Sequence, residues 1–280
     1  MNESLTNHSA QKELFSLHDL AITAAFTALV FLSTTLFSFA LVSSSGFFNL
    51  GEVFIYLAAL IGGPIVGMIS GAVGAAMGDM ALGFGNFAPG TFVIKGIEGF
   101  VAGMLFKYIK TIPDTVRYGV TAITTCFLVL FSIYVTTPFL NGVDGSSNVV
   151  MDMSLFIPTL DGVQQEIVTL SFPGFLLILL SILLSLAIWY TTLRLGEKGQ
   201  MAISCGVAGS LMVLGYFLYE IIVIGVPFAG ATGEIIFNIA QAGFSIAIAI
   251  PIVSYLHDLG ILDIKPSNFS KLSEQTISGD

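Results

Sequence analysis

Charged residues are scarce in this 280-residue chain. Asp, Glu, Lys and Arg make up only 10% of it, whereas soluble domains contain about 25%. In their place, 55% of the residues are hydrophobic and the mean hydropathy is +0.93. This composition predicts an integral membrane protein with a single membrane domain and no second core.

Basic residues, cysteines and catalytic motifs are also few. The 9 Lys and Arg form no basic run and the net charge is −9, so we expect no nucleic-acid partner. Cys126 and Cys205 stand in separate apolar runs, which excludes a disulfide framework and a cysteine metal site. The three histidines are far apart, and no P-loop, G-x-S-x-G or H-E-x-x-H sequence occurs. We therefore expect no metal, no cofactor and no enzymatic activity in this chain.

Apolar segments divide the chain. They cover residues 20–42, 52–62, 64–82, 91–109, 117–139, 173–195, 199–226 and 231–256. Most approach the roughly 20 residues that span a bilayer, but 52–62 is too short to cross alone. The sequence Gly62-Gly63-Pro64, which breaks helices, separates it from the next segment. Two interpretations are open: a short helix followed by a full one, or a single bent span.

The positions of Lys and Arg favour the first interpretation, which gives eight helices. Under the positive-inside rule, a cytoplasmic N-terminus then places the basic residues outside the helices on inner connections. The outer connections 43–51, 83–90, 140–172 and 227–230 contain no Lys or Arg. We therefore expect an all-α integral membrane protein whose membrane domain spans residues 20–256. The polar segments 1–19 and 257–280 are expected to be cytoplasmic, and the first is not a cleaved secretory signal.

The rare polar residues gather in the outer halves of the predicted helices. Lys95 and Glu98 lie three residues apart in an apolar, Gly-rich segment, on one helix face. A charge in hydrocarbon costs about 2.5–3.5 kcal/mol, so such residues face a partner or a cavity. The pair either forms a self-contained structural ion pair or also lines a polar site. Further polar residues predicted near the same level are Glu52, Asp79, Asn86, Tyr216, Glu220, Glu234, Asn238 and Gln241.

In the last segment, the polar residues share one helix face. Glu234, Asn238, Gln241 and Ser245 step by four, three and four residues. Aromatic residues at the same level are candidates for the walls of a pocket: Phe87, Phe92, Tyr216, Tyr219 and Phe228. A few polar groups among apolar and aromatic walls are typical of small-molecule sites. The pattern predicts a solute pocket that opens to the outside.

Small residues form stripes that predict close helix packing in lipid. One stripe consists of Gly67, Gly71, Gly74 and Gly78, and Gly99-x-x-x-Gly103 forms a second. A third stripe, Ala21, Ala25 and Ala28, follows one face of the first helix. The alanines either pack inside the protein or dock a helix of a partner.

Four patterns, in chain order, resemble the substrate-binding (S) components of energy-coupling factor (ECF) vitamin transporters. They are Leu60-Ile-Gly-Gly-Pro-Ile-Val-Gly67 with the Gly-rich helix to Asp79, Phe92-Val-Ile-Lys95-Gly-x-Glu98-Gly, Gly215-Tyr-Phe-x-x-x-Glu220, and Asn238-x-x-Gln241-x-Gly243 ahead of Pro251. The Ala21, Ala25 and Ala28 stripe is similar to the surface through which this family docks its transmembrane coupling subunit. The riboflavin-type branch fits best.

The resemblance implies a six-helix core, formed here by residues 20–109 and 199–256, that binds a vitamin at its outer face. It also implies import across the plasma membrane together with a coupling subunit and two cytoplasmic ATPases. Riboflavin is the first substrate to expect; folate, pantothenate or a thiamin-like solute would suit a similar set of residues. Residues 117–195 depart from the family as an inserted transmembrane hairpin with an outer loop, 140–172.

Two other functions remain as alternatives. A stand-alone secondary carrier would show inverted repeats and interrupted helices near the midplane, and the sequence contains no convincing repeat. An intramembrane enzyme acting on a lipid would need a cluster of carboxylates or histidines near one membrane surface, and no such cluster is evident in the sequence. A structural or assembly role would not require the polar residues to gather in the outer halves of the predicted helices.

Overall fold

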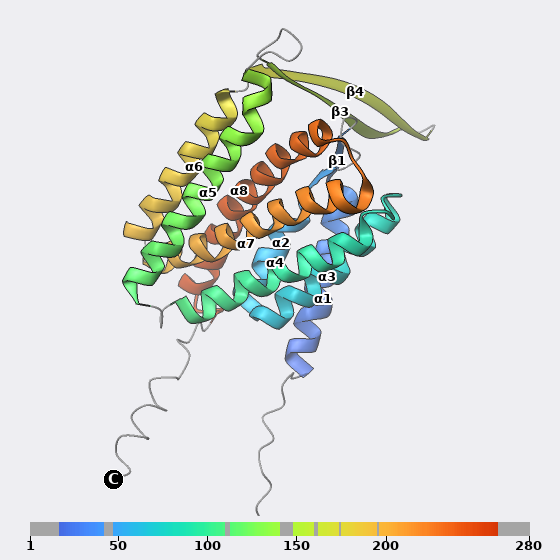
Figure 1. Cartoon of the computed structure of the whole chain (residues 1–280). Coiled ribbons are helices and arrows are strands. Elements are labelled where there is room, and N and C mark those ends of the chain that lie inside the picture. Colours follow the sequence, from blue (N-terminus) through green and yellow to red (C-terminus); the bar gives the residue numbers. More distant parts are fainter. Residues whose placement is uncertain are drawn as a thin grey trace, which may run out of the picture.

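The computed structural model describes residues 17–41, 47–109, 113–140, 148–159, 162–173, 175–194 and 196–262. Within these ranges the chain forms eight α-helices and a four-stranded antiparallel sheet (Figure 1). The helices are α1 (Leu17–Leu36), α2 (Gly51–Gly62), α3 (Pro64–Ala81), α4 (Ala88–Tyr108), α5 (Asp114–Leu140), α6 (Phe175–Arg194), α7 (Glu197–Tyr219) and α8 (Phe228–Asp258). The π-helix η2 (Glu220–Ile224) continues α7.

Six of the described helices are long and apolar enough to cross a membrane. They are α1, α3, α4, the first part of α5, the continuous α7–η2 and the second part of α8. Helix α2 and the middle of α6 are apolar but shorter. The predicted helical membrane protein is confirmed at this level, and the predicted helix ends mostly agree with the structure to within a few residues.

The break between α2 and α3 shows why the short helix is separate. Gly63 has a φ of 85°, a conformation that side chains other than glycine rarely adopt. Pro64 follows as the first residue of α3, where its missing N–H costs nothing and its ring presets the helical φ. The prediction of a short helix followed by a full one is confirmed.

Helix α2 is the central helix of the bundle and is surrounded by α1, α3, α4 and α8. Nearly all of its residues are buried. Tyr56 and Leu60 of α2 pack in the main apolar core with Ala102 of α4, Cys205 of α7 and Ala249 of α8. Because protein rather than lipid covers α2, its length need not match the thickness of a bilayer.

The glycine stripe of α3 packs closely against neighbouring helices. A Cβ atom on Gly67 would lie 2.7 Å from the carbonyl oxygen of Gly99, and one on Gly71 would meet the α4 backbone at 2.6 Å. Farther along, a Cβ atom on Gly74 would lie 2.7 Å from the carbonyl oxygen of Thr27 in α1. The predicted close packing is therefore present, with α4 against the first part of the stripe and α1 against the second.

Helices α5 and α6 pack side by side at the edge of the bundle, and α6 also contacts α7 (Figure 1). A hydrogen bond from Trp189 Nε1 to Thr125 Oγ1, 3.2 Å long, joins the pair. Phe131 of α5 meets Phe217 of α7 edge to face. The two helices thus form a unit attached to the side of the bundle.

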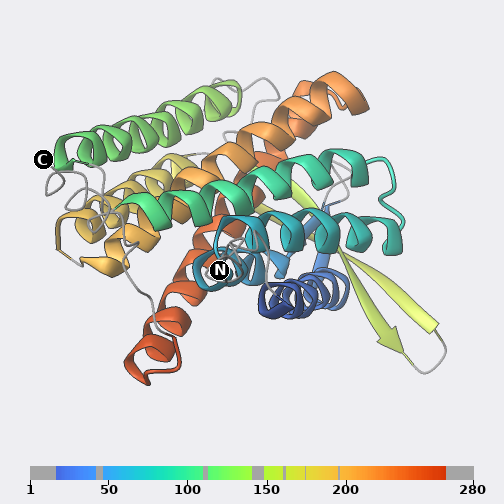
Figure 2. The same ribbon diagram turned by 90° about the horizontal axis from the view of Figure 1, so that it is seen from below.

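The sheet is a feature that the sequence-based fold class, all-α, did not include. Strands β1 (Ser38–Leu41) and β2 (Phe47–Asn49) lie between α1 and α2, and β3 (Asn148–Thr159) and β4 (Gly162–Pro173) form a hairpin between α5 and α6. Their order is β2-β1-β3-β4, with Ala40 opposite Ser154. Figure 2 shows the β3–β4 hairpin projecting beyond the helices.

Two predicted boundaries change as a result. The first helix ends at Leu36 rather than at 42, because the chain then enters β1. The segment 140–172, predicted as a loop, contains most of the β3–β4 hairpin. Since β1 and β3 are more than 100 residues apart in the sequence, no local pattern indicates that they pair.

We predict that Gly67→Ala destabilises the protein, whereas Gly119→Ala does not. The new methyl group at position 67 would lie 2.7 Å from Gly99 O and 2.8 Å from Ala59 Cβ, and such overpacking costs about 1–3 kcal/mol. At Gly119 in α5 no heavy atom lies within 4 Å of the added Cβ, so helix propensity favours alanine there. The midpoint of thermal unfolding in detergent, measured for both variants, tests this prediction. Equal midpoints for the two would refute the close α3–α4 contact.

Candidate functional site

A narrow cavity lies at the end of the bundle that carries the sheet. Residues from α1, β2, α3, α4, α7 and α8 line it. These residues are Thr34, Phe47, Asn49, Ala75, Asp79, Phe87, Thr91, Lys95, Tyr216, Glu234, Asn238 and Gln241. About 410 Å³ of space is free of atoms, counted together with the open mouth. The cavity therefore combines polar and aromatic side chains from helices that are far apart in the sequence.

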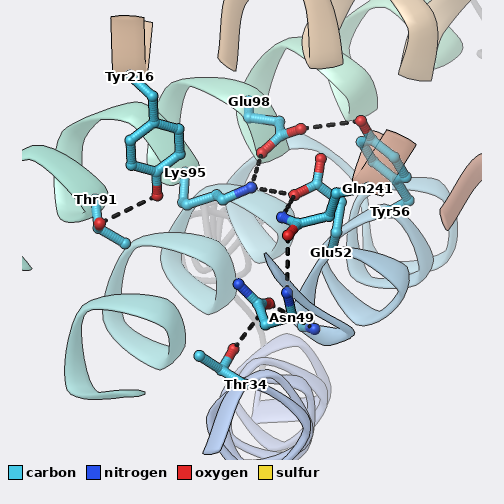
Figure 3. A network of polar contacts seen from close by, with 10 residues as sticks. Thr34, Asn49, Glu52, Tyr56, Thr91, Lys95, Glu98, Tyr216 and Gln241 are labelled. Atoms are coloured by element: carbon cyan, nitrogen blue, oxygen red, sulfur yellow. Dashed lines mark hydrogen bonds and ion pairs between the residues drawn. The ribbon is translucent and has the colours of Figure 1, made fainter. Parts of the chain in front are cut away.

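Lys95 lies at the centre of a buried ion-pair network (Figure 3). Its Nζ donates to Glu52 Oε2 and, at 3.0 Å, to Glu98 Oε2. The side chain of Lys95 is 3% exposed, and those of both carboxylates are 0% exposed. The predicted Lys95–Glu98 pair is present, and Lys95 also lines the cavity, so the two interpretations of this pair are compatible.

Three neutral groups complete this network. Tyr56 donates its hydroxyl to Glu98 Oε1 at 2.9 Å, and Gln241 Nε2 donates to Glu52 Oε2 at 3.0 Å. Gln241 Oε1 in turn accepts the backbone N–H of Asn49 at 2.9 Å. The network thus connects α2, α4, α8 and the end of β2. Hydrogen bonds of this kind lower the cost of burying the charges, although Glu52 Oε1 has no hydrogen-bond partner within the described residues.

A second polar group lies around Tyr216. Its hydroxyl donates to Thr91 Oγ1 at 3.0 Å, and Lys95 Nζ lies 5.6 Å from the centre of its ring. Cations are attracted to aromatic rings at this separation. Asp79 interacts with Thr91, is 3% exposed, and its Oδ2 has no hydrogen-bond partner within the described part of the chain. This oxygen is an acceptor in the cavity wall without a donor.

Two acidic residues meet beside the cavity. Glu220 at the start of η2 is fully buried, and its carboxyl group interacts with that of Glu234 in α8. Two carboxyl groups can share a hydrogen bond only if one of them carries a proton. Glu234 lines the cavity and Glu220 lies behind it. The pair places a second acidic group in the wall, apart from the Lys95 network.

The structure brings most of the predicted site residues together. The predicted residues that line the cavity are Asp79, Lys95, Tyr216, Glu234, Asn238 and Gln241. Glu52, Glu98 and Glu220 contact lining residues from behind. Asn86 differs: it is exposed, lies just before α4 and is not part of the lining, although its carbonyl oxygen accepts the Tyr219 hydroxyl at 2.8 Å.

The predicted aromatic walls are present in part. Phe87 and Tyr216 line the cavity, and Tyr219 packs near Phe87 with ring centres 6.5 Å apart. Phe92 and Phe228 are 50% and 43% exposed and lie outside the lining. Their position on the outer side of the helices agrees with the enrichment of aromatic residues at membrane interfaces.

Several site residues escaped the sequence analysis. In the cavity lining they are Thr34, Phe47, Asn49, Ala75 and Thr91, and Tyr56 belongs to the network. Two of them carry a local signal: Thr91 precedes Lys95 by four residues, and Tyr56 follows Glu52 by four, which places each pair on one helix face. Phe47 and Asn49 carry none, because the position of β2 depends on its strand partner.

The alanine stripe of α1 faces outward. Ala21, Ala25 and Ala28 are all exposed, as are the neighbouring Leu29 and Leu32. The opposite face of α1, with Thr23 and Val30, packs into the bundle. Within the described residues, the stripe therefore does not pack inside the protein.

We predict that Lys95→Met strongly destabilises the protein, by about 3–5 kcal/mol, because it leaves Glu52 and Glu98 buried without a cation. The matched control is Lys107→Met at the exposed end of α4. The double variant Lys95→Met/Glu52→Gln should recover part of the loss. Thermal unfolding in detergent tests all three, and similar midpoints for the two single variants would contradict the role of the network.

The family described as "ECF-type riboflavin transporter, S component" matches residues 14–172, which is more than half of the chain. A protein of Pyrococcus woesei described as "Uncharacterized protein in gap 3'region" is 33% identical over 109 residues, which is 38% of this chain and 73% of that protein. No solved structure matches. The family match includes the cavity residues on α1, β2, α3 and α4, while those on α7 and α8 lie beyond it.

Proposed function

This chain belongs to the family of ECF-type riboflavin transporter S components, and we propose that its cavity is the site where riboflavin binds. The chain is therefore a vitamin-binding subunit of a plasma-membrane transporter and not an enzyme. The observation that carries the proposal is the cavity itself, in which polar and aromatic side chains from six elements converge at one end of the bundle.

The chemistry of the lining suits a flavin. A flavin has a flat ring system, an edge with alternating donors and acceptors, and a polyhydroxyl side chain. The rings of Phe47, Phe87 and Tyr216 offer aromatic surfaces. The amide of Asn238 offers both donors and an acceptor, and Asp79 offers a buried acceptor. We assign ligand contacts to these five residues.

The other polar residues support the site rather than contact the ligand. Glu52 and Glu98 hold Lys95, and Gln241 is bonded to both Glu52 and the backbone of Asn49. Each of these side chains is at most 5% exposed. A fixed floor of this kind lowers the entropy lost on binding, because the groups that face the ligand are already positioned.

The proposed topology places both termini in the cytoplasm and the cavity at the outer face. The start of α1 and the end of α8 lie at the same end of the bundle, opposite the sheet (Figure 1). Lys107 near the end of α4, Arg117 in the first turn of α5 and Lys198 in the first turn of α7 fall on connections assigned to the cytoplasm. The remaining parts of the predicted tails, 1–16 and 263–280, lie outside the described residues.

The proposed core consists of α1–α4 with α7 and α8, and α5 and α6 form the inserted hairpin. Its support is the packing: the core helices surround α2 and the cavity, whereas α5 and α6 pack at the edge. The hairpin leaves the order of the core helices unchanged, because two added crossings return the chain to the same side.

The family implies ECF module partners as well as a vitamin substrate. We propose a transmembrane coupling subunit and two cytoplasmic ATPases, since the chain has no P-loop of its own. We further propose that the coupling subunit docks on Ala21, Ala25 and Ala28. Small side chains on a lipid-facing helix allow a second helix to approach closely, and this face of α1 contacts no other part of the described protein.

We predict that the purified protein binds riboflavin and quenches its fluorescence. Asn238→Ala should weaken binding about thirtyfold, since two lost hydrogen bonds are worth about 1 kcal/mol each. Ser254→Ala is the control, because Ser254 lies on the same helix outside the cavity. Flavin retained through purification would also show in the absorbance spectrum and by mass spectrometry. Absence of riboflavin binding would refute the substrate, and unchanged binding by Asn238→Ala would refute the location.

We predict that Ala25→Leu impairs riboflavin uptake by cells that contain the complete transporter but leaves binding to the purified subunit unchanged. An overpacked helix contact costs about 1–3 kcal/mol, or about fivefold or more in the affinity of the complex. Ala122→Leu is the matched control, because Ala122 is exposed on α5, outside the proposed docking face. Equal uptake by both variants would contradict docking at α1.

A further inference from the structure

We infer that strand β3, which lies in the chain between α5 and α6, positions Phe47 in the wall of the cavity and thereby sets how tightly the ligand is held. The inference rests on the proposed function and adds a supporting element to the same site. Three observations carry it. Phe47 lines the cavity, the two ends of β2 are held by different parts of the molecule, and the register of the sheet aligns Phe47 with β3.

The Asn49 end of β2 is held by the helices. The backbone N–H of Asn49 donates to Gln241 Oε1 of α8 at 2.9 Å, and its side-chain Oδ1 accepts the N–H of Gly51, the first residue of α2, at 2.8 Å. The next residue, Leu50, donates its N–H to the carbonyl oxygen of Phe37, just after α1, at 3.3 Å. Three hydrogen bonds in addition to the strand pairing therefore hold this end.

The Phe47 end of β2 is held by the sheet. Its backbone pairs with Ala40 of β1, and its ring packs against that of Phe84 with the ring centres 4.7 Å apart. The pairing of β1 with β2 extends only from Ser38 to Ala40. A two-stranded ribbon is at best marginally stable in water, and three or more strands are needed for independent stability. The position of Phe47 therefore depends on what supports β1 from its other side.

Strand β3 supports β1 at the residue that pairs with Phe47. Ala40 lies opposite Phe47 on one side and opposite Ser154 of β3 on the other, and Ser154 in turn lies opposite Ile167 of β4. One row of residues thus crosses all four strands and ends at Phe47. Because of this pairing, β1 is an inner strand of a four-stranded sheet rather than half of an isolated ribbon.

The β3–β4 hairpin is long enough to act as this support. Its two strands pair along 12 residues each, from Asn148 opposite Pro173 to Thr159 opposite Gly162. The hairpin extends from α5 and α6 across the end of the bundle to β1 (Figure 1). A wall residue that leaves its position lowers the fraction of the protein that is competent to bind, and the apparent dissociation constant rises by the same factor.

The first test removes the hairpin from the protein. Residues 149–172 are replaced by a short Gly-Ser linker, because Asn148 and Pro173 lie opposite one another and are easily joined. We expect riboflavin to bind at least about tenfold more weakly, as it would if only about a tenth of the protein kept the wall in place. Fluorescence quenching measures the affinity, and thermal unfolding without ligand shows that the shortened protein is folded. Wild-type affinity would overturn the inference.

The matched control shortens the hairpin but keeps its pairing with β1. Residues 156–165 are replaced by a two-residue turn, and Leu155 and Glu166, which lie opposite one another, carry the new turn. Ser154 then remains opposite Ala40. We expect wild-type affinity for riboflavin. Equal weakening in both shortened proteins would place the effect in the outer part of the hairpin and would contradict support through β1.

A double-variant cycle distinguishes positioning of Phe47 from a direct contact between the hairpin and the ligand. Phe47→Ala removes the aromatic ring from the wall, so removal of the hairpin in this variant should cause little further loss of affinity. A loss as large as in the wild-type background would show that the hairpin acts independently of Phe47, and the inference would fail.

The intact chain provides a test that does not depend on folding of the shortened protein. Ala40→Cys with Ser154→Cys, combined with Cys126→Ser to remove the exposed native thiol, places two thiols on opposed residues of antiparallel strands. Their Cα atoms are about 4.5–5.5 Å apart, which suits a disulfide. We expect the bond to form on mild oxidation and the oxidised protein to bind riboflavin as tightly as the reduced one, because the bond fixes the pairing that the ligand-bound state uses.

Failure of this disulfide to form, or weaker binding after oxidation, overturns the inference. The outcomes also separate it from the proposed function. If the wild-type protein binds no flavin, the proposed function fails and the inference fails with it. If the wild-type protein binds riboflavin and removal of the hairpin leaves the affinity unchanged, only the inference fails.

Discussion

The buried ammonium group of Lys95 is the contact on which both the bundle and the cavity depend. It holds Glu52 of α2 and Glu98 of α4, and neither carboxylate is exposed. Tyr56 donates to Glu98 Oε1 and Gln241 donates to Glu52 Oε2, and these hydrogen bonds lower the cost of burying the two carboxylates. The same contacts fix the floor of the cavity, so the stability of the fold and the shape of the site are coupled.

The glycine stripe of α3 makes this network possible. Because Gly71 has no side chain, the backbone of α4 at Lys95 lies against α3, where a Cβ atom would meet the carbonyl oxygen at 2.6 Å. Helix α2 can then lie between α1, α3, α4 and α8 and present Glu52 to Lys95. A sequence feature that looks like simple packing therefore determines how the charged residues meet.

An ECF transporter binds its solute in one subunit and hydrolyses ATP in others. The surfaces of this chain fit the role of the solute-binding subunit. The polar side chains lie in the cavity, while the alanines of α1 remain uncovered on the outside. The sheet adds a connection that belongs to this chain: β2 contributes Phe47 and Asn49 to the cavity, and β1 joins β2 to the β3–β4 hairpin. The α5–α6 pair is therefore hydrogen-bonded to the wall of the site through a continuous sheet.

Features that depend on residues close together in the sequence could be predicted before the structure was known. Apolar runs located the eight helices, Gly63 and Pro64 separated α2 from α3, and a spacing of three residues paired Lys95 with Glu98. Helical periodicity likewise placed Asn238 and Gln241 on one face, and that face lines the cavity.

Contacts between elements that are far apart in the sequence depend on the packing of the whole chain. Glu52 joins Lys95 across 43 residues, and Gln241 joins Glu52 across 189. Strand β1 pairs with β3, and Asn86 turns out of the site that its neighbours line. These contacts depend on how whole helices and strands pack against one another. The periodicity of side chains, by contrast, shows only which residues share a face of one helix or strand. Many of the residues that line the cavity could therefore be named from the sequence, whereas the partner of each one could not.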